Sequence, residues 1–295
     1  MERKIFVYEN FSSLEPKKLG VLYVDTLRGI EHYSFEYDQD WLKQLLKPGS
    51  SLGGARPKAT VEDKQGNLWI AKFPSKNDEY DVGAWEKVVH DLAKLCGLNV
   101  PESKVEKFSK DGSTFLVKRF DQDGEKRIHF ASAMTMLGKN DGASSDDGSS
   151  YVDIVDFIRA YGSSPKDDLI ELFKRIIFSM AVSNTDDHLR NHGFILNDKG
   201  WKLSPLYDVN PVPYGDVLSL NIDSYDNSIS IDLAISSACY YDINECDAEA
   251  YADEILTMVK NNWEQLAKKY GINRDQIEEM RPAFSVCYEF KKLEE

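Results

Sequence analysis

The stretch SNTDDHLRNHGFILNDKGWKLSPLYDVNP, residues 183–211, carries the most informative pattern in the chain. Asp186 and Asn191 stand five residues apart near its start, and Asp208 lies near its end. Between them are two short runs whose composition predicts a pair of strands. These runs cover 193–196 and 201–204. The stretch therefore predicts a polar loop, a strand pair and a further carboxylate on the next turn.

These three side chains fit the chemistry of phosphoryl transfer to a hydroxyl. One carboxylate orients or deprotonates the attacking hydroxyl, while an amide oxygen and a second carboxylate hold Mg²⁺ against the phosphates. Protein kinases use the same D-x-x-x-x-N spacing, followed by an Asp on a later turn. In this interpretation Asp186 is the catalytic base, Asn191 a metal ligand and Asp208 the main metal ligand.

Two plainer interpretations compete with this one. Asp and Asn are the commonest loop residues, so a D-x-x-x-x-N match on its own says little, and the strand pair with the Tyr207-Asp208 turn adds the weight. His188 and His192 are four residues apart, as in some metal sites, but no Glu follows His188 as in H-E-x-x-H. We therefore interpret His188 as a hydrogen-bonded structural residue of the loop.

Three further signals lie upstream. The segment SLGGARPK, 51–58, has small residues that let backbone N–H groups approach phosphate oxygens, although it lacks Walker A spacing. Lys72 ends an apolar strand from which a lysine can reach nucleotide phosphates, and Glu86 on the following helix is its candidate partner. The apolar strand 115–122 is a candidate backbone contact for adenine. The plain alternatives are an ordinary loop, a surface lysine, a solvent-facing glutamate and a connecting strand.

The chain divides into a β-rich part and a mainly helical part. Strands are predicted at 4–8, 19–25, 32–37, 58–63, 68–73, 103–108 and 114–120. Helical periodicity predicts helices at 80–96, 167–182, 247–268 and 273–280. The polar Gly/Ser-rich stretch 138–150 is predicted to be a mobile loop and is a candidate substrate or activation segment. The expected fold is α+β with two lobes, 1–121 and 122–295, and a ligand cleft between them.

Composition narrows the class of protein. The chain has 295 residues, of which 42% are hydrophobic and 29% charged, which is typical of soluble globular proteins. It has no apolar run of 18 residues and no secretory signal pattern, so a cytoplasmic protein is expected. The net charge of −14 argues against a general nucleic-acid binder. Four scattered cysteines without a CxxC pair argue against a zinc site.

In the order of its motifs the chain resembles the HipA-like serine/threonine kinases, bacterial kinases often encoded as toxins of toxin–antitoxin modules. Counterparts of the family's phosphate loop, ATP-lysine strand, N-lobe helix, hinge, catalytic loop and metal loop are found at 51–58, 70–74, 86–101, 119–121, 185–191 and 203–208. The last two are the most specific as a pair. The resemblance covers most of the chain and implies a two-lobed protein-kinase-like fold, with a β-rich N-lobe and a helical C-lobe.

The resemblance also implies roles for individual residues. Asp186 would be the catalytic base, while Asn191 and Asp208 would bind Mg²⁺. The implied ATP-binding residues are Lys72, Ser51, Gly53, Gly54, Ala55, Lys58 and Glu86, with the backbone of Lys118 and Phe120 at adenine and Asp121 at the ribose.

Ser51 occupies the position that family members autophosphorylate, with Ser50 as the adjacent alternative. Phosphate at this position adds negative charge beside the nucleotide phosphates. The resemblance implies that the resulting repulsion would displace the phosphate loop and inactivate the kinase.

Two departures from the family pattern stand out. The family usually carries a longer N-terminal subdomain, whereas here the chain passes from 37–42 almost directly to 48–50. Since that region contributes to antitoxin contacts in the family, its shortening puts antitoxin binding in question. The phosphate loop carries Arg56-Pro57 where better-known members have a Gln-Glu pair, so its mobility is expected to differ.

The main interpretation is a serine/threonine protein kinase that uses ATP and Mg²⁺. The family's familiar partners are a protein substrate, an aminoacyl-tRNA synthetase, and an antitoxin; no membrane and no direct nucleic-acid partner is expected. A small-molecule kinase is a second interpretation, because similar sites serve other hydroxyl acceptors. A third is a nucleotide-binding interaction protein without catalysis, against which the joint presence of Lys72, Asp186 and Asp208 argues.

Overall fold

The structure is a computed structural model that describes residues 3–9, 17–27, 30–37, 57–108, 112–123 and 126–290. The predicted phosphate-loop residues Ser51, Gly53, Gly54 and Ala55, with the alternative acceptor Ser50, lie outside these ranges. Among the described residues, no helix is long and apolar enough to cross a membrane.

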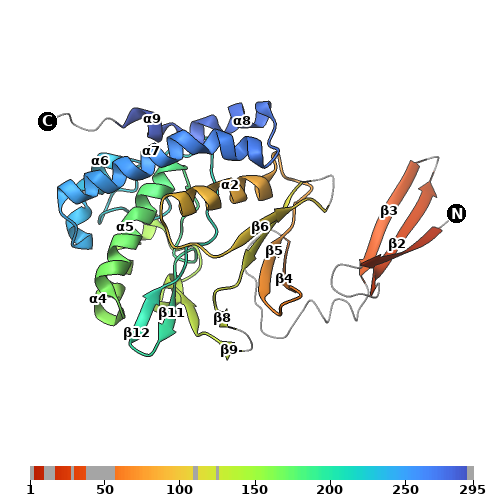
Figure 1. The fold of residues 1–295 in the computed structure, drawn as a ribbon, viewed down its shortest axis with the longest axis horizontal. Helices are drawn as coiled ribbons and strands as arrows, with labels where there is room; N and C mark the ends of the chain where they lie inside the picture. Colours follow the sequence, from red (N-terminus) through yellow and green to blue (C-terminus); the bar gives the residue numbers. More distant parts are fainter. Residues whose placement is uncertain are drawn as a thin grey trace.

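The first three strands form a sheet of their own. They are β1 (Arg3–Glu9), β2 (Lys17–Leu27) and β3 (Ile30–Tyr37), all antiparallel in the order β1-β2-β3. Figure 1 draws this sheet apart from the remaining elements, at the N-terminal end of the chain. The three strands predicted from alternating apolar residues are therefore confirmed.

A second antiparallel sheet has the strand order β4-β5-β7-β6. Its strands are β4 (Lys58–Glu62), β5 (Leu68–Lys72), β6 (Ser103–Glu106) and β7 (Thr114–Lys118). Asp63 closes the β4–β5 turn by accepting hydrogen bonds from the backbone N–H groups of Gln65 and Asn67, both at 2.9 Å. Gly66 supplies the positive φ of 82° that this turn requires. The hairpin fixes the register that places Lys72 at the end of β5.

Helix α2 (Val82–Leu95) joins this sheet to the helical part of the chain. A Cβ on Gly83 would lie 2.2 Å from the backbone oxygen of Ser113, so only glycine allows the helix to approach β7 this closely. On its other side α2 packs against α7 (Glu245–Lys269), as Figure 1 shows. The Trp85 ring stacks on Trp263 with centroids 6.5 Å apart, and both side chains are fully buried. One hydrophobic core therefore includes α2 and the helices of the second half.

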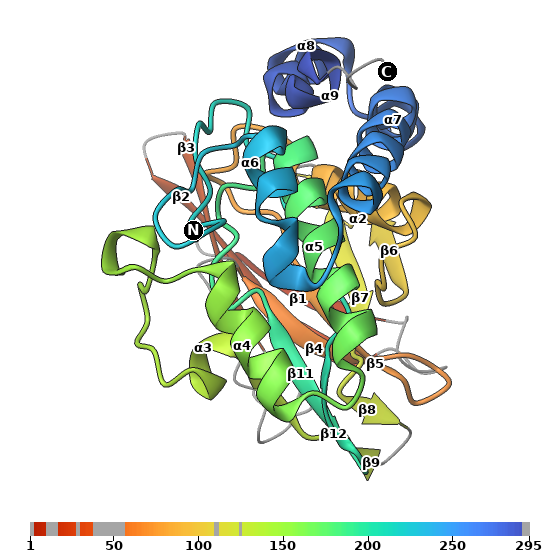
Figure 2. The ribbon, with the colours of Figure 1, turned by 90° about the vertical axis from the view of Figure 1, so that its left-hand side faces the viewer.

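The second half is mainly helical, with two small sheets. Its helices are α3 (Ala133–Met136), α4 (Tyr151–Tyr161), α5 (Pro165–Ala181), α6 (Ile231–Ser236), α7, α8 (Arg274–Met280) and α9 (Val286–Glu289). Its strands are β8 (Gln122–Asp123), β9 (Lys126–Arg127), β10 (Phe130–Ser132), β11 (Gly193–Asn197) and β12 (Gly200–Leu203). Figure 2 shows α5 in the middle, with α4, α6 and α7 around it. Since α5 is buried along most of its length, the loop that follows it starts from a rigid support.

The sequence did not anticipate several of these elements. Helix α4, the short helix α6 and the strands β8, β9 and β10 were not predicted. The stretch 138–150, predicted as a mobile polar loop, contains a 3₁₀ turn at Ser145–Asp147. It is also tied to the segment at 219–221, because the N–H of Ser145 donates to the oxygen of Ser219 at 2.8 Å. Gly/Ser-rich composition alone missed this packing.

Candidate active site

Lys72 lies at the centre of the candidate site. Its Nζ is 2.6 Å from Oδ1 of Asp208, which follows β12, and it also forms an ion pair with Oε1 of Glu86 on α2. The Lys72 and Glu86 side chains are about one-tenth exposed or less, whereas that of Asp208 is 35% exposed. The lysine therefore links the β4–β7 sheet, helix α2 and the loop after β12.

Burial and charge act in opposite directions on these three groups. Burial alone would lower the pKa of Lys72, but the carboxylates of Glu86 and Asp208 outweigh it, so that the pKa is raised. Burial alone would raise the pKa of Asp208, but Lys72 outweighs it and the pKa is lowered. For Glu86 burial dominates, and its pKa is raised despite Lys72. The surroundings therefore favour the charged forms of Lys72 and Asp208, whereas burial disfavours the charged form of Glu86.

Lys58 is the second cation beside the site. It is the direct cross-strand neighbour of Lys72 in the β4–β5 pair, so the two residues share a face of the sheet. Its positive charge is among the influences that lower the pKa of Asp208. Two lysines that share a face of the sheet therefore act on the Asp208 carboxylate.

Asp186 and Asn191 lie on the loop between α5 and β11. The Asp186 side chain is 81% exposed, and His188 Nε2 lies 3.8 Å from its Oδ1. Nδ2 of Asn191 donates to the backbone oxygen of Asp186 at 2.8 Å and to that of Asp208 at 3.5 Å. Asn191 thereby joins the two loops, and its Oδ1 accepts no hydrogen bond from any described residue.

The neighbouring residue Asp187 anchors this loop from below. It is buried, and its carboxylate accepts hydrogen bonds from Tyr151 Oη at 2.7 Å and Ser179 Oγ at 3.1 Å, and contacts His192 Nε2 at 2.9 Å. Burial alone would raise its pKa, but His192 and the hydroxyl donors outweigh it, so the pKa is lowered. A buried carboxylate bound on three sides holds the chain so that Asp186 faces outward.

Helix α5 also holds the loop that carries Asp208. Arg175 is 1% exposed and its Nη2 donates to the backbone oxygen of Ser204 at 2.7 Å. Asp168, about two turns earlier on the same helix, accepts a hydrogen bond from the N–H of Leu203 at 3.0 Å. Sequence reasoning missed both residues, together with Asp187. For Asp168 and Arg175, the only available signal was their spacing of seven residues, which puts them on one face of α5.

Lys118 and Phe120, the two residues predicted to contact adenine through their backbone, differ in the hydrogen bonding of their N–H groups. The Lys118 N–H already donates to the oxygen of Glu102 at 2.8 Å, whereas the N–H of Phe120 makes no hydrogen bond to the described residues. The Phe120 ring lies 5.8 Å from that of Tyr207, next to Asp208. Phe120, rather than Lys118, therefore offers a donor at this position.

The carboxylate of Asp121 is occupied in this structure. Its two oxygens accept hydrogen bonds from Nε and Nη2 of Arg119, at 2.8 and 2.5 Å. A sugar hydroxyl at Asp121 would therefore share the carboxylate with Arg119 or replace it.

The donor set fits a magnesium ion. Asp208 and the free Oδ1 of Asn191 supply hard oxygen atoms, and Mg²⁺ typically takes one or two carboxylates and completes its coordination with phosphates and water. No group of three or more His, Cys, Asp or Glu residues arranged for a metal occurs among the described residues. Two protein ligands are what a metal bound together with a nucleotide needs.

The pattern of the HipA-like C-terminal domain matches residues 50–281. The chain belongs to this family. The resemblance inferred from the motifs is therefore confirmed, and the matched range includes every residue of the candidate site.

Several curated relatives carry kinase names. The chain is 32% identical over 157 residues to "Putative kinase Y4mE" of Sinorhizobium fredii, covering 50% of this chain and 36% of the relative. It is 25% identical over 258 residues to a "Putative kinase" of Haemophilus influenzae, covering 80% of this chain and 71% of that protein. The first alignment thus spans about a third of the relative's length, and the activity of the whole protein remains a proposal.

Two solved structures share the fold. HipA of Shewanella oneidensis MR-1, solved with HipB and operator DNA, superposes with a TM-score of 0.67 at 18% identity, covering 83% of this chain and 66% of that one. The proinflammatory kinase CtkA of Helicobacter pylori gives a TM-score of 0.57 at 17% identity, covering 82% and 90%. The predicted α+β, kinase-like fold of this HipA-like chain is confirmed.

Proposed function

We propose that this HipA-like chain is an ATP-dependent serine/threonine protein kinase. The observation that carries the proposal is the position of Lys72, which bridges Glu86 of α2 and Asp208 beyond β12. Phosphoryl transfer depends on a lysine held in this way and on a carboxylate that can bind the metal. An exposed carboxylate, Asp186, lies on the adjoining loop.

Each side chain then has one task. Asp186 accepts the proton of the attacking hydroxyl, Lys72 and Lys58 bind phosphate oxygens, and Asn191 and Asp208 hold Mg²⁺. The bound metal neutralises charge on the phosphates. The N–H of Phe120 is the proposed donor to adenine, and Asp121 the proposed acceptor from the ribose.

We further propose that residues 1–121 and 122–295 act as the two lobes and that Ser51 is an autophosphorylation site. Lys58, which follows Ser51 by seven positions in the sequence, lies opposite Lys72 in the β4–β5 pair, so the start of β4 is beside the site. Phosphate on Ser51 would compete with the nucleotide for the same cations.

The biological setting is proposed from the family. The related HipA was solved with HipB and operator DNA. We propose that this chain is the toxin of a toxin–antitoxin module in the cytoplasm, with an antitoxin as its partner. Its substrate would be a protein, for which an aminoacyl-tRNA synthetase is the first candidate to test.

Intact mass spectrometry after incubation with Mg·ATP tests the proposed function. The parent should gain one phosphate that maps to Ser51, while Asp186→Asn gains none. Asp198→Asn, an exposed carboxylate in the β11–β12 turn, is the control and should behave as the parent. Phosphate mapped to another residue would keep the kinase and overturn the Ser51 assignment. No phosphate on the parent or on added proteins would overturn the protein kinase and favour a small-molecule acceptor.

A further inference from the structure

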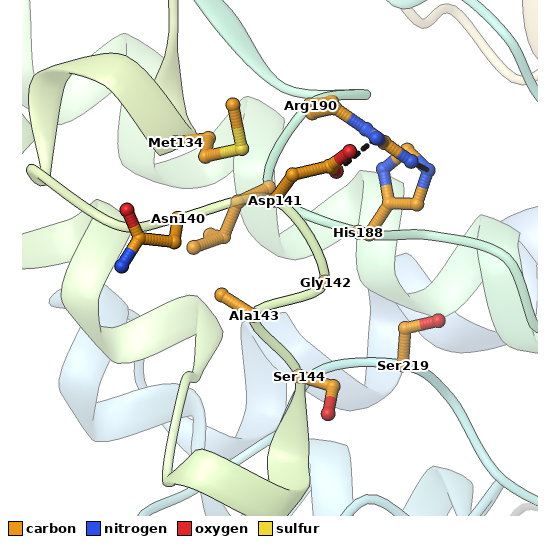
Figure 3. A pocket seen from close by; sticks show the side chains of 10 residues that line it. Met134, Asn140, Asp141, Gly142, Ala143, Ser144, His188, Arg190 and Ser219 are labelled. Carbon is orange, nitrogen blue, oxygen red and sulfur yellow. Dashed lines mark hydrogen bonds and ion pairs between the residues drawn. The ribbon is translucent and has the colours of Figure 1, made fainter. Parts of the chain in front are cut away.

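A cavity of about 130 Å³ lies beside the loop that carries Asp186. One wall is the segment 140–144 and the other is the segment 188–190, with Met134 and Ser219 completing the lining (Figure 3). None of the roles assigned above uses these residues. The cavity adjoins the proposed base through His188, which lines it and whose Nε2 lies 3.8 Å from Oδ1 of Asp186.

Arg190 is the cation of this cavity. Its Nη1 forms an ion pair with Oδ1 of Asp141, and its Nη2 donates to Nε2 of His188 at 3.1 Å (Figure 3). The backbone of Arg190 is fixed, because Tyr207 Oη donates to its carbonyl oxygen at 2.6 Å. Among the residues that line the cavity, the guanidinium is therefore held through both terminal nitrogens, by Asp141 and by His188.

The ion pair between Arg190 and Asp141 is exposed and incomplete. The two side chains are 45% and 70% exposed, and ion pairs of this kind contribute little to stability in water. Asp141 contributes one oxygen, whereas a guanidinium favours a carboxylate or phosphate that accepts two parallel hydrogen bonds. A better-placed anion would therefore replace Asp141 at little expense.

The guanidinium is also close to Asp186. His188 Nε2 contacts both groups, with Oδ1 of Asp186 at 3.8 Å and Nη2 of Arg190 at 3.1 Å. A single imidazole thus separates the proposed base from the cation. An extended peptide advances about 3.3 Å per residue, so a residue one or two positions from the acceptor hydroxyl would reach Arg190.

We infer that Arg190 forms a binding site for an acidic side chain of the protein substrate, next to the serine or threonine that is phosphorylated. The acidic side chain replaces Asp141, which occupies the site when no substrate is bound. This inference rests on the proposed function, because it takes Asp186 as the residue that meets the acceptor hydroxyl. The net charge of −14 repels an acidic substrate at long range, so the binding of such a substrate depends on a local cation such as Arg190.

Substitutions of Arg190 and Asp141 should then change the affinity for an acidic peptide in opposite directions. Arg190→Gln removes the site, whereas Asp141→Asn removes the internal competitor and frees the cation. If the pair served only to hold the 140–144 segment in place, both changes would have the same effect. The exposed pair of Arg159 and Asp242, with side chains 41% and 62% exposed, provides matched controls.

The experiment uses serine peptides that carry Glu, Ala or Lys at each position flanking the serine, with initial rates measured under Mg·ATP. The parent should show a lower KM for the best Glu peptide than for its Ala counterpart. Arg190→Gln should raise the KM for the Glu peptide about tenfold, the effect of losing a charge-assisted pair of hydrogen bonds. Asp141→Asn should lower it about twofold to threefold, and Arg159→Gln and Asp242→Asn should leave it unchanged.

Binding separates this inference from the proposed function. Fluorescence anisotropy with labelled Glu and Ala peptides is measured on Asp186→Asn, alone and combined with Arg190→Gln. If the protein prefers the Glu peptide and Arg190→Gln abolishes this preference, the site is supported. This holds even if no phosphoryl transfer is seen, a result that would contradict only the proposed kinase activity. Phosphorylation without any preference for Glu, or equal effects of Arg190→Gln and Asp141→Asn, overturns the site and leaves the kinase in place.

Discussion

Lys72 and Asp208 are 136 positions apart in the sequence, yet their side chains meet at 2.6 Å. Lys72 ends strand β5, and Asp208 follows strand β12, the second strand of the β11–β12 hairpin. Lys72 also contacts Glu86, and the backbone oxygen of Asp208 accepts a hydrogen bond from Asn191. Glu86 and Asn191 belong to a third and a fourth segment of the chain. The site is therefore assembled by packing, and its first test is to break this contact.

Replacing Lys72 with Met should abolish most of the proposed activity. The change removes the cation that is proposed to bind the phosphates and leaves the buried Glu86 without its partner, so kcat should fall about 10²–10³-fold. Rates of phosphoryl transfer measure this directly. Lys76→Met, an exposed lysine just beyond the strand, is the control and should keep the parent rate. A Lys72→Met variant with the parent rate would remove the basis of the proposed function.

Gly83→Ala should destabilise the protein although alanine is the better helix former. The added methyl group would lie 2.2 Å from the backbone oxygen of Ser113, so the helix must move away from the sheet. We expect a loss of about 1–3 kcal/mol in the free energy of unfolding, measured with denaturant, and a lower kcat because α2 carries Glu86. Lys94→Ala on the exposed side of the same helix should change neither quantity. An unchanged stability in Gly83→Ala would mean that α2 does not approach the sheet so closely.

Asp187→Asn should lower the thermal stability in a pH-dependent way. The carboxylate has a lowered pKa in the folded protein, so the stability it contributes is present above its unfolded pKa, about 3.9, and is lost as the pH falls further. At pH 7 the variant should lose about 2 kcal/mol or more, because it leaves buried donors poorly paired. The gap in Tm between parent and variant should narrow below about pH 4. A gap that stays constant down to pH 3 would contradict an ionised Asp187.

Asp121 should decide how well ATP is distinguished from its 2′-deoxy and 3′-deoxy analogues. A ribose hydroxyl that donates to this carboxylate would be worth about tenfold in KM. The parent should prefer ATP over at least one analogue by about that factor, and Asp121→Ala should not. Arg119→Gln, which frees the carboxylate, should keep the preference. Equal KM values for the three nucleotides in the parent would restrict Asp121 to pairing with Arg119.

Features that depend on nearby residues were predictable from the sequence. The D-x-x-x-x-N spacing is read directly from the sequence. Contacts between neighbours along the chain form the β11–β12 pair, the amphipathic α5 and the β4–β5 hairpin with its Gly66 turn. Because strands and helices repeat with fixed periods, alternating or helical apolar patterns located most of the larger elements. The family resemblance followed from the same local motifs.

Tertiary structure decided what these motifs touch. Whether Glu86 faces solvent or Lys72 was open in the sequence, since it stands beside the buried Trp85, and the packing of α2 between the sheet and α7 settled it. The same holds for Asp187, one position from the exposed Asp186 yet buried against Tyr151 and Ser179. A charged side chain can be buried only where distant segments supply its hydrogen bonds. Composition and periodicity do not record which segments meet, so these partners emerge only when the whole chain is packed.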